Sequence, residues 1–405
     1  MDHHRVLYVS GSLGLGHVTR DLAIALELRR QLPGVEISWL AAHPASMLLE
    51  QAGEPVVPEA AAYANENELA ELSAQGSSLN LLRYLIRARG AWGQNVAVFS
   101  RLVKTTPFDL VIGDETYELT LALRENRRLK TFKFVMIFDF VGLEAMTANP
   151  LENLGVYIWN RKWSHDFRMR RPPSYDLGLF VGEAEDVPDA PFGIGLPNRR
   201  AFAEAMYRFV GFVFPFDPRD LMDRVEVRRR LGYGDTPLVI ASIGGTSIGR
   251  HLLELCGAAY RHIQAKMPSL RLVLVAGPRL GADTVKIPPG VEIRQFIPDL
   301  YQHFAACDVA IVQGGATSTL EVAALRRPFV YFPLEGHSEQ AGVAKMLTRR
   351  GAGTPMQFSR TTPEELAGKV LGLLGSEVSH PVIPADGARR AASLIAGLLA
   401  GPDSD

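Results

Sequence analysis

The chain repeats one pattern twice, and this repetition limits its fold more than any other feature. Short runs of β-branched and aliphatic residues alternate with longer stretches whose apolar residues recur at helical spacing. Such alternation is typical of βαβ units, in which helices connect the strands of a parallel sheet. The predicted strands are Val6–Ser10, Glu36–Ala41, Leu110–Ile112 and Phe134–Ile137, then Leu238–Ser242, Leu272–Ala276, Val291–Gln295, Val309–Val312 and Phe329–Phe332. Clear helical spacing is found at Leu22–Leu32 and Leu79–Lys104.

A Phe/Pro-rich segment, Gly211–Pro218, separates the two series. Proline fits poorly into helices and central strands, so this segment is the best linker candidate. We therefore predict an α/β protein of two Rossmann-like domains, residues 1–210 and 211–383. The length of 405 residues suits two such domains. A last helical stretch lies within residues 384–405, and its periodicity leaves open whether it packs back on the first domain.

Composition excludes several classes of protein. Hydrophobic residues make up 47% and charged residues 21% of the chain, as in globular proteins. The net charge of -1 gives no overall attraction to nucleic acid. Neither of the two cysteines, Cys256 and Cys307, belongs to a CxxC pair, so we expect neither a disulfide framework nor a structural zinc site. Few residues precede the first predicted strand and no run of eighteen apolar residues occurs, so we expect a cytoplasmic protein.

The first chemically informative segment is the glycine-rich turn Gly11–His17, which follows the strand Val6–Ser10. Its glycines, Gly14 and Gly16 among them, allow the backbone to approach a ligand closely at a helix N-terminus. His17 has a suitable side chain for a general base. The ordinary alternative is a histidine that only fills the turn.

Asp114 lies just past the strand Leu110–Ile112, at the edge where α/β sheets place functional groups. Its carboxylate is a candidate partner for the second ring nitrogen of His17, which would fix the tautomer and stabilise the imidazolium. The alternative role is that of an N-cap for the helix expected at Thr116–Arg124.

Two glycine-rich loops of the second domain resemble anion-binding turns. One runs from Ser242 to Arg250 and the other from Gln313 to Glu321, and each joins a strand end to a helix start. Paired glycines and hydroxyl residues in this position direct backbone N–H groups at an anion. Glu321 is a candidate for binding a ribose diol, and its alternative is a solvent-facing acid in the first turn.

Together these residues resemble the GT-B glycosyltransferases, in particular the group that contains MurG and the UDP-sugar transferases of lipids and small molecules. The likeness is strongest over Leu238–Gly353. It implies an acceptor-side loop at Gly14 and Gly16, a catalytic dyad of His17 and Asp114, and an active site in the cleft between the two domains. The donor-binding residues that the resemblance implies are Gly244, Gly245, Thr246, Ser247, Arg250, Phe296, Ile297, Gly314, Gly315, Ala316, Thr317, Ser318, Glu321, His337, Glu339 and Gln340.

The resemblance also implies the reaction. We expect an inverting transfer of a sugar from a nucleotide-sugar donor, UDP-linked by analogy, to an acceptor hydroxyl on a lipid, a lipid-linked saccharide or a small molecule. We expect no cofactor, no bound metal and no nucleic-acid partner. Gln313 stands where many members have a phosphate-binding histidine, and His337 and Glu339 alter the sugar-contact loop.

Other interpretations stay open. A UDP-sugar 2-epimerase shares the two-domain architecture, and a catalytically silent nucleotide-sugar-binding subunit or a dinucleotide oxidoreductase would fit parts of the pattern. The stretch Leu79–Arg89 mixes leucines with Arg83, Arg87 and Arg89, and Arg161, Lys162 and Arg168–Arg171 add more positive charge. These basic segments either dock on an anionic membrane, at its inner face, or are ordinary solvated surfaces.

Overall fold

The computed structural model describes residues 3–10, 15–64, 74–75, 78–79, 81–145, 148–244, 249–277, 279–335 and 337–400, with the backbone alone for 74–75, 78–79, 81–89 and 338. The chain forms two compact units. Unit 1 comprises Met1–Ala70, Leu81–Pro215 and Pro384–Asp405, and unit 2 comprises Glu71–Asn80 and Phe216–Ile383. The main division therefore lies between Pro215 and Phe216, inside the Phe/Pro-rich segment.

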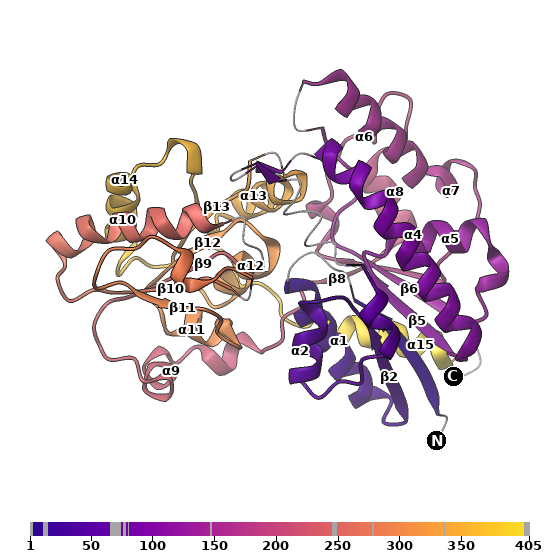
Figure 1. The fold of residues 1–405 in the computed structure, drawn as a ribbon, viewed down its shortest axis with the longest axis horizontal. Coiled ribbons are helices and arrows are strands. Elements are labelled where there is room, and N and C mark those ends of the chain that lie inside the picture. The colour runs from indigo at the N-terminus through magenta and orange to yellow at the C-terminus, as the bar shows by residue number, and fades with distance from the viewer. Residues whose placement is uncertain are drawn as a thin grey trace. The chain divides into compact units, whose positions relative to one another are not determined.

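Unit 1 contains a six-stranded parallel sheet in the order β2-β1-β5-β6-β7-β8 (Figure 1). Its strands are β1 (His4–Val9), β2 (Val35–Leu40), β5 (Leu110–Asp114), β6 (Lys133–Phe138), β7 (Leu177–Val181) and β8 (Arg208–Gly211). Its helices are α1 (Gly16–Gln31), α2 (Ala45–Gln51), α4 (Leu81–Thr105), α5 (Tyr117–Glu125), α6 (Pro150–Trp163), α7 (His165–Arg168), α8 (Arg199–Met206) and α15 (Gly387–Ala400). Short 3-10 turns lie at Pro58–Ala62, Arg127–Leu129 and Ala184–Asp186.

Side chains of the sheet alternate between two hydrophobic layers, as a period of two requires. Leu7 and Val9 of β1 join a cluster with residues of α4, α5 and α8, whereas Val6 and Tyr8 join a cluster with α1, α2 and α15. The last helix, α15, thus completes the core of unit 1. Its small buried residues Ala391 and Ala392 let it pack closely against α1.

Unit 2 contains a second six-stranded parallel sheet, in the order β11-β10-β9-β12-β13-β14. The strands are β9 (Leu238–Ser242), β10 (Arg271–Val275), β11 (Glu292–Arg294), β12 (Val309–Gln313), β13 (Phe329–Phe332) and β14 (Thr354–Pro355). The helices are α9 (Arg224–Leu231), α10 (Arg250–Lys266), α11 (Leu300–Ala306), α12 (Ala316–Ala324), α13 (Ser338–Arg350) and α14 (Pro363–Leu373). Additional short elements are the ribbon β3 (Ala74–Gln75) and β4 (Ser78–Leu79) and the 3-10 turns Pro218–Leu221, Ala282–Thr284 and Phe358–Arg360.

The predicted α/β fold is confirmed in both units, but several elements differ from expectation. Strands β7, β8 and β14 were not predicted, because β7 contains a glycine, β8 has only four residues and β14 only two. The two-residue strands β3 and β4 were not predicted either. A Cβ at Gly178 in β7 would lie 2.7 Å from the Tyr207 ring, so glycine is required there by packing. Helix α1 begins at Gly16 and not near Leu22, because its polar first turn lacks the apolar spacing on which the prediction rests.

Candidate functional site

The candidate base and its partner come from the topological switch point of the unit 1 sheet. The chain leaves β1 toward β2 on one side, and β5 lies on the other side of β1. In open α/β sheets, ligands bind outside the carboxyl ends of the strands at such a point. His17 lies in the first turn of α1, directly after β1, and Asp114 is the last residue of β5. Gly16 begins α1, while Gly14 lies outside the described residues.

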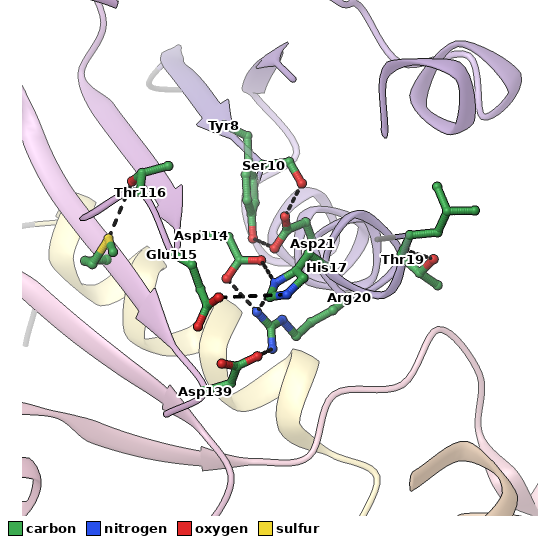
Figure 2. A network of polar contacts seen from close by, with 12 residues as sticks. Tyr8, Ser10, His17, Thr19, Arg20, Asp21, Asp114, Glu115, Thr116 and Asp139 are labelled. Atoms are coloured by element: carbon green, nitrogen blue, oxygen red, sulfur yellow. Dashed lines mark hydrogen bonds and ion pairs between the residues drawn. The ribbon is translucent and has the colours of Figure 1, made fainter. Parts of the chain in front are cut away.

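His17 and Asp114 are in direct contact (Figure 2). The distance between His17 Nδ1 and Asp114 Oδ2 is 2.8 Å, with side-chain exposures of 11% and 0%. Because a carboxylate only accepts hydrogen bonds, Nδ1 carries the hydrogen and Nε2 is left for a substrate. Asp114 therefore does not cap α5, whose first turn follows Thr116.

Arg20 joins this pair to a second carboxylate (Figure 2). Its Nη2 donates to Asp114 Oδ1 at 2.6 Å and lies 2.9 Å from His17 Nδ1, and its Nη1 donates to Asp139 Oδ2 at 3.0 Å. Asp139 directly follows β6, the strand next to β5. Both oxygens of Asp114 are thus engaged, which holds the carboxylate in one orientation.

Burial and charge compete over the protonation of His17. Burial alone lowers its pKa and Arg20 acts in the same direction, but Asp114 and Asp139 outweigh them, and the pKa is raised to about 9. Burial by itself would raise the pKa of Asp139, yet its hydrogen bonding with Glu115 and the charge of Arg20 hold that pKa well below its ordinary value. His17 is therefore an imidazolium at neutral pH in the free protein.

Glu115 faces the other side of the imidazole. Its Oε2 lies 3.9 Å from His17 Nε2, and its Oε1 accepts a hydrogen bond of 3.1 Å from the Tyr117 hydroxyl. Glu115 has a φ of 54°, a left-handed conformation that is unfavourable for a residue with a Cβ. Such strain is typical of functional sites, where the surroundings hold the residue in place.

Behind the dyad, Asp21 is fully buried. It accepts hydrogen bonds from the Tyr8 hydroxyl at 2.9 Å and the Ser10 hydroxyl at 2.5 Å. Burial, and next the neighbouring Asp114, raise the pKa of Asp21, which favours its neutral form. This arrangement avoids a further buried negative charge beside the dyad.

The site also has spacing compatible with a cation. His17, Glu115 and Asp139 each offer one ligand atom, and these atoms lie within 4.8 Å of one another. Arg20 already supplies a positive charge to Asp139 at 3.0 Å, which would compete with a metal ion for that carboxylate.

The sequence analysis did not identify Arg20, Asp139 or Glu115 as site residues. Two features of the sequence point to Arg20 and Asp139. Arg20 is three residues after His17, which places both on one helix face. Asp139 follows the carboxyl end of a buried strand, the same position that singled out Asp114.

In unit 2, both predicted donor loops start at a switch point, since β9 and β12, the strands that they follow, lie next to each other there. Gly244 follows β9, and Gly314 and Gly315 follow β12. Within the described residues, no side chain caps α10 or α12, and neither helix has an acidic residue in its first turn. Two uncapped helix N-termini therefore present backbone N–H groups where an anion would bind.

Glycine is required by close contacts at this edge of the sheet. A Cβ at Gly314 would lie 2.6 Å from Pro333 Cα, and one at Gly277 would lie 2.2 Å from the Gly244 carbonyl oxygen. Arg250 is the exposed first residue of α10, and Ala316, Thr317 and Ser318 form the first turn of α12. Gly245, Thr246 and Ser247 lie outside the described residues.

Gln313 and Glu321 are polar residues buried beside these loops. Gln313 is 8% exposed, and its Nε2 has no hydrogen-bond partner among the described residues. Glu321 is 7% exposed, so the alternative of a solvent-facing acid is wrong. Burial, with a contribution from Asp299, raises the pKa of Glu321 to about 8. Both side chains are available to hydrogen-bond a polar ligand.

The remaining predicted donor residues follow β11 and β13. Phe296 is half-buried and Ile297 buried, just after β11. His337 caps α13 by accepting from the Gln340 backbone N–H at 3.4 Å, and Gln340 Oε1 accepts from the Leu334 N–H at 2.8 Å. Glu339 lies in the first turn of α13. All of them therefore belong to the carboxyl edge of the unit 2 sheet.

Comparison with known proteins relates both units to glycosyltransferases. Residues 239–381 match the model of the glycosyltransferase family 28 C-terminal domain. An uncharacterized glycosyltransferase of Methanosarcina mazei is 33% identical over 371 residues, covering 89% of this chain and 86% of the relative.

Another relative is the UDP-N-acetylglucosamine–N-acetylmuramyl-(pentapeptide) pyrophosphoryl-undecaprenol N-acetylglucosamine transferase of Carboxydothermus hydrogenoformans. It is 26% identical over 206 residues, covering 49% of this chain and 51% of the relative. The chain spans about half the length of several curated relatives that it matches, between 48% and 54%. The crystal structure of the kitacinnamycin glycotransferase shares the fold, with a TM-score of 0.61 at 17% identity, covering 99% of this chain and 96% of that one.

Proposed function

Because this chain belongs to the MurG-like glycosyltransferases of the GT-B fold, we propose that it transfers a sugar from a UDP-linked donor to an acceptor hydroxyl. The transfer inverts the anomeric configuration and needs no metal ion. The observation that carries this proposal is the 2.8 Å contact between His17 and the fully buried Asp114 at the switch point of unit 1.

In this mechanism, His17 Nε2 takes the proton of the acceptor hydroxyl as its oxygen bonds to the anomeric carbon. The bond from that carbon to the donor phosphate breaks on the opposite face, so the configuration inverts and UDP leaves. Asp114 stabilises the imidazolium that forms, and Arg20 keeps Asp114 oriented. The imidazole must be neutral to accept a proton. Because the pKa of His17 is raised to about 9, the rate of transfer rises with pH as the imidazolium loses its proton.

The donor is held by unit 2 in this proposal. Negative charge develops on the departing diphosphate, and the uncapped N-termini of α10 and α12 offer fixed dipoles and N–H donors for it. The buried Gln313 Nε2, which has no hydrogen-bond partner among the described residues, adds a donor beside the same loops. In this proposal, Glu321 hydrogen-bonds the ribose hydroxyls.

Replacing His17 by Ala tests the assignment of the base. We expect sugar transfer to fall by about 10²–10⁴-fold, because general-base catalysis is lost. Donor binding is expected to survive, which the rise in melting temperature with UDP would show. His262→Ala, at a half-exposed position on α10, is the matched control. Transfer is measured as UDP release in a screen of donors with lipid-linked and small-molecule acceptors. Loss of the UDP effect in His17→Ala would count against the assigned role.

We further propose that the acceptor is apolar and reached at a membrane surface. Helix α6 exposes Leu151, Leu154 and Ile158 by 66%, 56% and 47%, at helical spacing on one face. The exposed Arg161 and Lys162 end the same helix. An apolar stripe next to positive charge suits the surface of an anionic bilayer.

Among the described residues, every helix is too short or too polar to cross a membrane. The side chains of Arg83, Arg87 and Arg89 lie outside the described residues.

A further inference from the structure

Three side chains of unit 1 converge on one point beside the candidate base (Figure 2). His17 extends from the first turn of α1, Glu115 follows β5, and Asp139 follows β6. One ligand atom of each lies within 4.8 Å of those of the other two. The transfer proposed above uses His17 as a base and assigns no step to Glu115, so it does not explain why the three converge.

The spacing of these atoms suits the ligands of one small divalent ion. Ligand atoms at about 2.1 Å from a tetrahedral ion lie about 3.4 Å from one another. His17 Nε2 and Glu115 Oε2 are 3.9 Å apart, and 4.8 Å is the upper limit for the three atoms. The three side chains therefore close on an ion with movements of roughly 1 Å or less.

His17 and Glu115 are each held through one atom and present the other. His17 Nδ1 contacts Asp114 at 2.8 Å, which leaves Nε2 as the available ring nitrogen. Glu115 Oε1 accepts a hydrogen bond of 3.1 Å from Tyr117, while Oε2 faces Nε2. A metal-binding histidine almost always donates its second ring nitrogen to a carboxylate or carbonyl, and carboxylate ligands are themselves hydrogen-bonded. The surroundings of both residues match those of metal ligands.

Asp139 supplies a buried oxygen as the third ligand. Its side chain is 11% exposed, and its Oδ1 is buried and accepts from no N–H or hydroxyl group in the described part of the chain. Arg20 donates to the other oxygen, Oδ2, and so leaves Oδ1 to a ligand. Buried polar atoms without a donor are rare in native proteins, and a bound ion is one explanation for them.

Glu115 and Asp139 also contact each other. Their carboxyl groups are hydrogen-bonded. Two carboxyl groups in contact share one proton or hold a cation between them, because two adjacent negative charges repel each other. A metal ion takes the place of the shared proton and binds both carboxylates.

We propose that His17, Glu115 and Asp139 form a binding site for one divalent transition-metal ion such as Zn²⁺. Imidazole is a good ligand for Zn²⁺, whereas Mg²⁺ prefers oxygen ligands. The guanidinium of Arg20 repels a cation, so the expected affinity is micromolar. Binding does not depend on the proposed function. The inhibition that follows from it does, because an ion on Nε2 blocks the nitrogen that takes the acceptor proton.

Cobalt(II) tests the site directly, because its visible absorption changes with the number and geometry of its ligands. The intact chain is titrated with Co²⁺ at about pH 8, since the metal must replace the proton on Nε2. We expect saturable binding with micromolar affinity. Zn²⁺ is expected to displace the bound Co²⁺, and Mg²⁺ at the same concentration is not.

Glu115→Gln removes the charge of one ligand without changing the shape of its side chain. Its matched control is Glu254→Gln, because Glu254 lies 3.1 Å from His251 on the surface of α10, outside the site. We expect Co²⁺ binding to weaken by more than about tenfold in Glu115→Gln and to stay unchanged in Glu254→Gln. Tyr117→Phe removes only the hydrogen bond to Glu115 and is expected to weaken binding about tenfold. It keeps all three ligands, so it tests the inference even if Glu115→Gln folds poorly.

Absence of saturable Co²⁺ binding, or equal affinity in Glu115→Gln and the intact chain, would overturn the inference. Displacement of Co²⁺ by Mg²⁺ as readily as by Zn²⁺ would also overturn it, in favour of a site of oxygen ligands alone. Saturating Zn²⁺ is expected to abolish transfer, and EDTA to restore it; full activity of the Zn²⁺-loaded protein would contradict the inhibition. Stabilisation by UDP, measured in EDTA, tests the donor site of unit 2 separately. Failure of Co²⁺ binding with retained UDP binding would therefore leave the proposed function standing.

Discussion

At the scale of single residues, the candidate site is an arrangement of competing charges around one imidazole. His17 is flanked by Asp114 on one ring nitrogen and by Glu115 near the other, and Arg20 bridges Asp114 to Asp139. Two effects lower the pKa of His17, burial and Arg20, and the carboxylates reverse them. The imidazole is therefore a base whose strength the protein has increased, and Asp114 is the largest cause of that increase.

Asp114→Asn tests this interpretation. Without the carboxylate, burial and Arg20 lower the pKa of His17, and the imidazolium formed during transfer is no longer stabilised. We expect kcat to fall by about 10²–10⁴-fold, and the alkaline midpoint of the pH–rate profile to move to lower pH.

Steady-state kinetics across pH measures both effects. Asp176→Asn is the matched control, since Asp176 accepts hydrogen bonds from Lys130 and the Phe134 N–H at the start of β6, at the opposite end of that strand from Asp139. An Asp114→Asn enzyme with the kcat and pH profile of the unmodified protein would show that the contact is not catalytic.

The residue scale also shows the limit of sequence reasoning. His17 and Asp114 were predicted because each follows a buried strand, and the structure brings their side chains together. Glu115 was not predicted, because its position depends on a backbone φ of 54°, and a glutamate in the sequence does not indicate such a conformation.

At the scale of elements, periodicity predicts buried strands well and polar helix ends poorly. Strands β9, β10, β12 and β13 are almost entirely buried, and all four were predicted within one residue at each end. The edge strand β11 is only partly buried, but its isoleucine and the flanking apolar residues were enough to predict it within one residue. The start of α1 was placed six residues late, because its first turn carries His17, Arg20 and Asp21 in place of apolar residues. The polar side chains that suit this helix terminus to a functional role are the same ones that remove the apolar spacing from which a helix is predicted.

Helix α6 carries a prediction of its own. The change is the triple substitution of Leu151, Leu154 and Ile158 by Ser, all on its exposed face. Binding to phosphatidylglycerol vesicles is expected to weaken at least about tenfold, because three apolar side chains no longer enter the interface. The melting temperature is expected to change little, since these side chains are exposed.

Vesicle co-sedimentation measures this binding. The matched control is the triple Ser variant at Met222, Val225 and Val382 of unit 2, which are 45%, 73% and 71% exposed. If both triple variants bind vesicles as the unmodified chain does, α6 is not the membrane contact.

At the scale of the whole molecule, two sheets of the same topology class provide two different sites. In each sheet the candidate residues gather at the carboxyl edge beside the switch point: charged side chains in unit 1, and glycine turns with uncapped helices in unit 2. The repeated βα pattern predicts both sheets, because parallel strands need helical connections. It does not predict that α15, from the end of the chain, completes the core of unit 1 against α1. That contact depends on small side chains whose partner is far away in sequence.

The most direct test of the central claim, that His17 is the base of a glycosyl transfer, compares the pH dependence of the transfer rate with the titration of the His17 ring followed by NMR. The His17→Ala spectrum identifies the His17 signal by its absence. We predict that the ring titrates with a midpoint near pH 9 and that the rate rises along the same curve, since only the neutral imidazole accepts the proton. A rate that stays constant while the ring loses its proton would contradict the account.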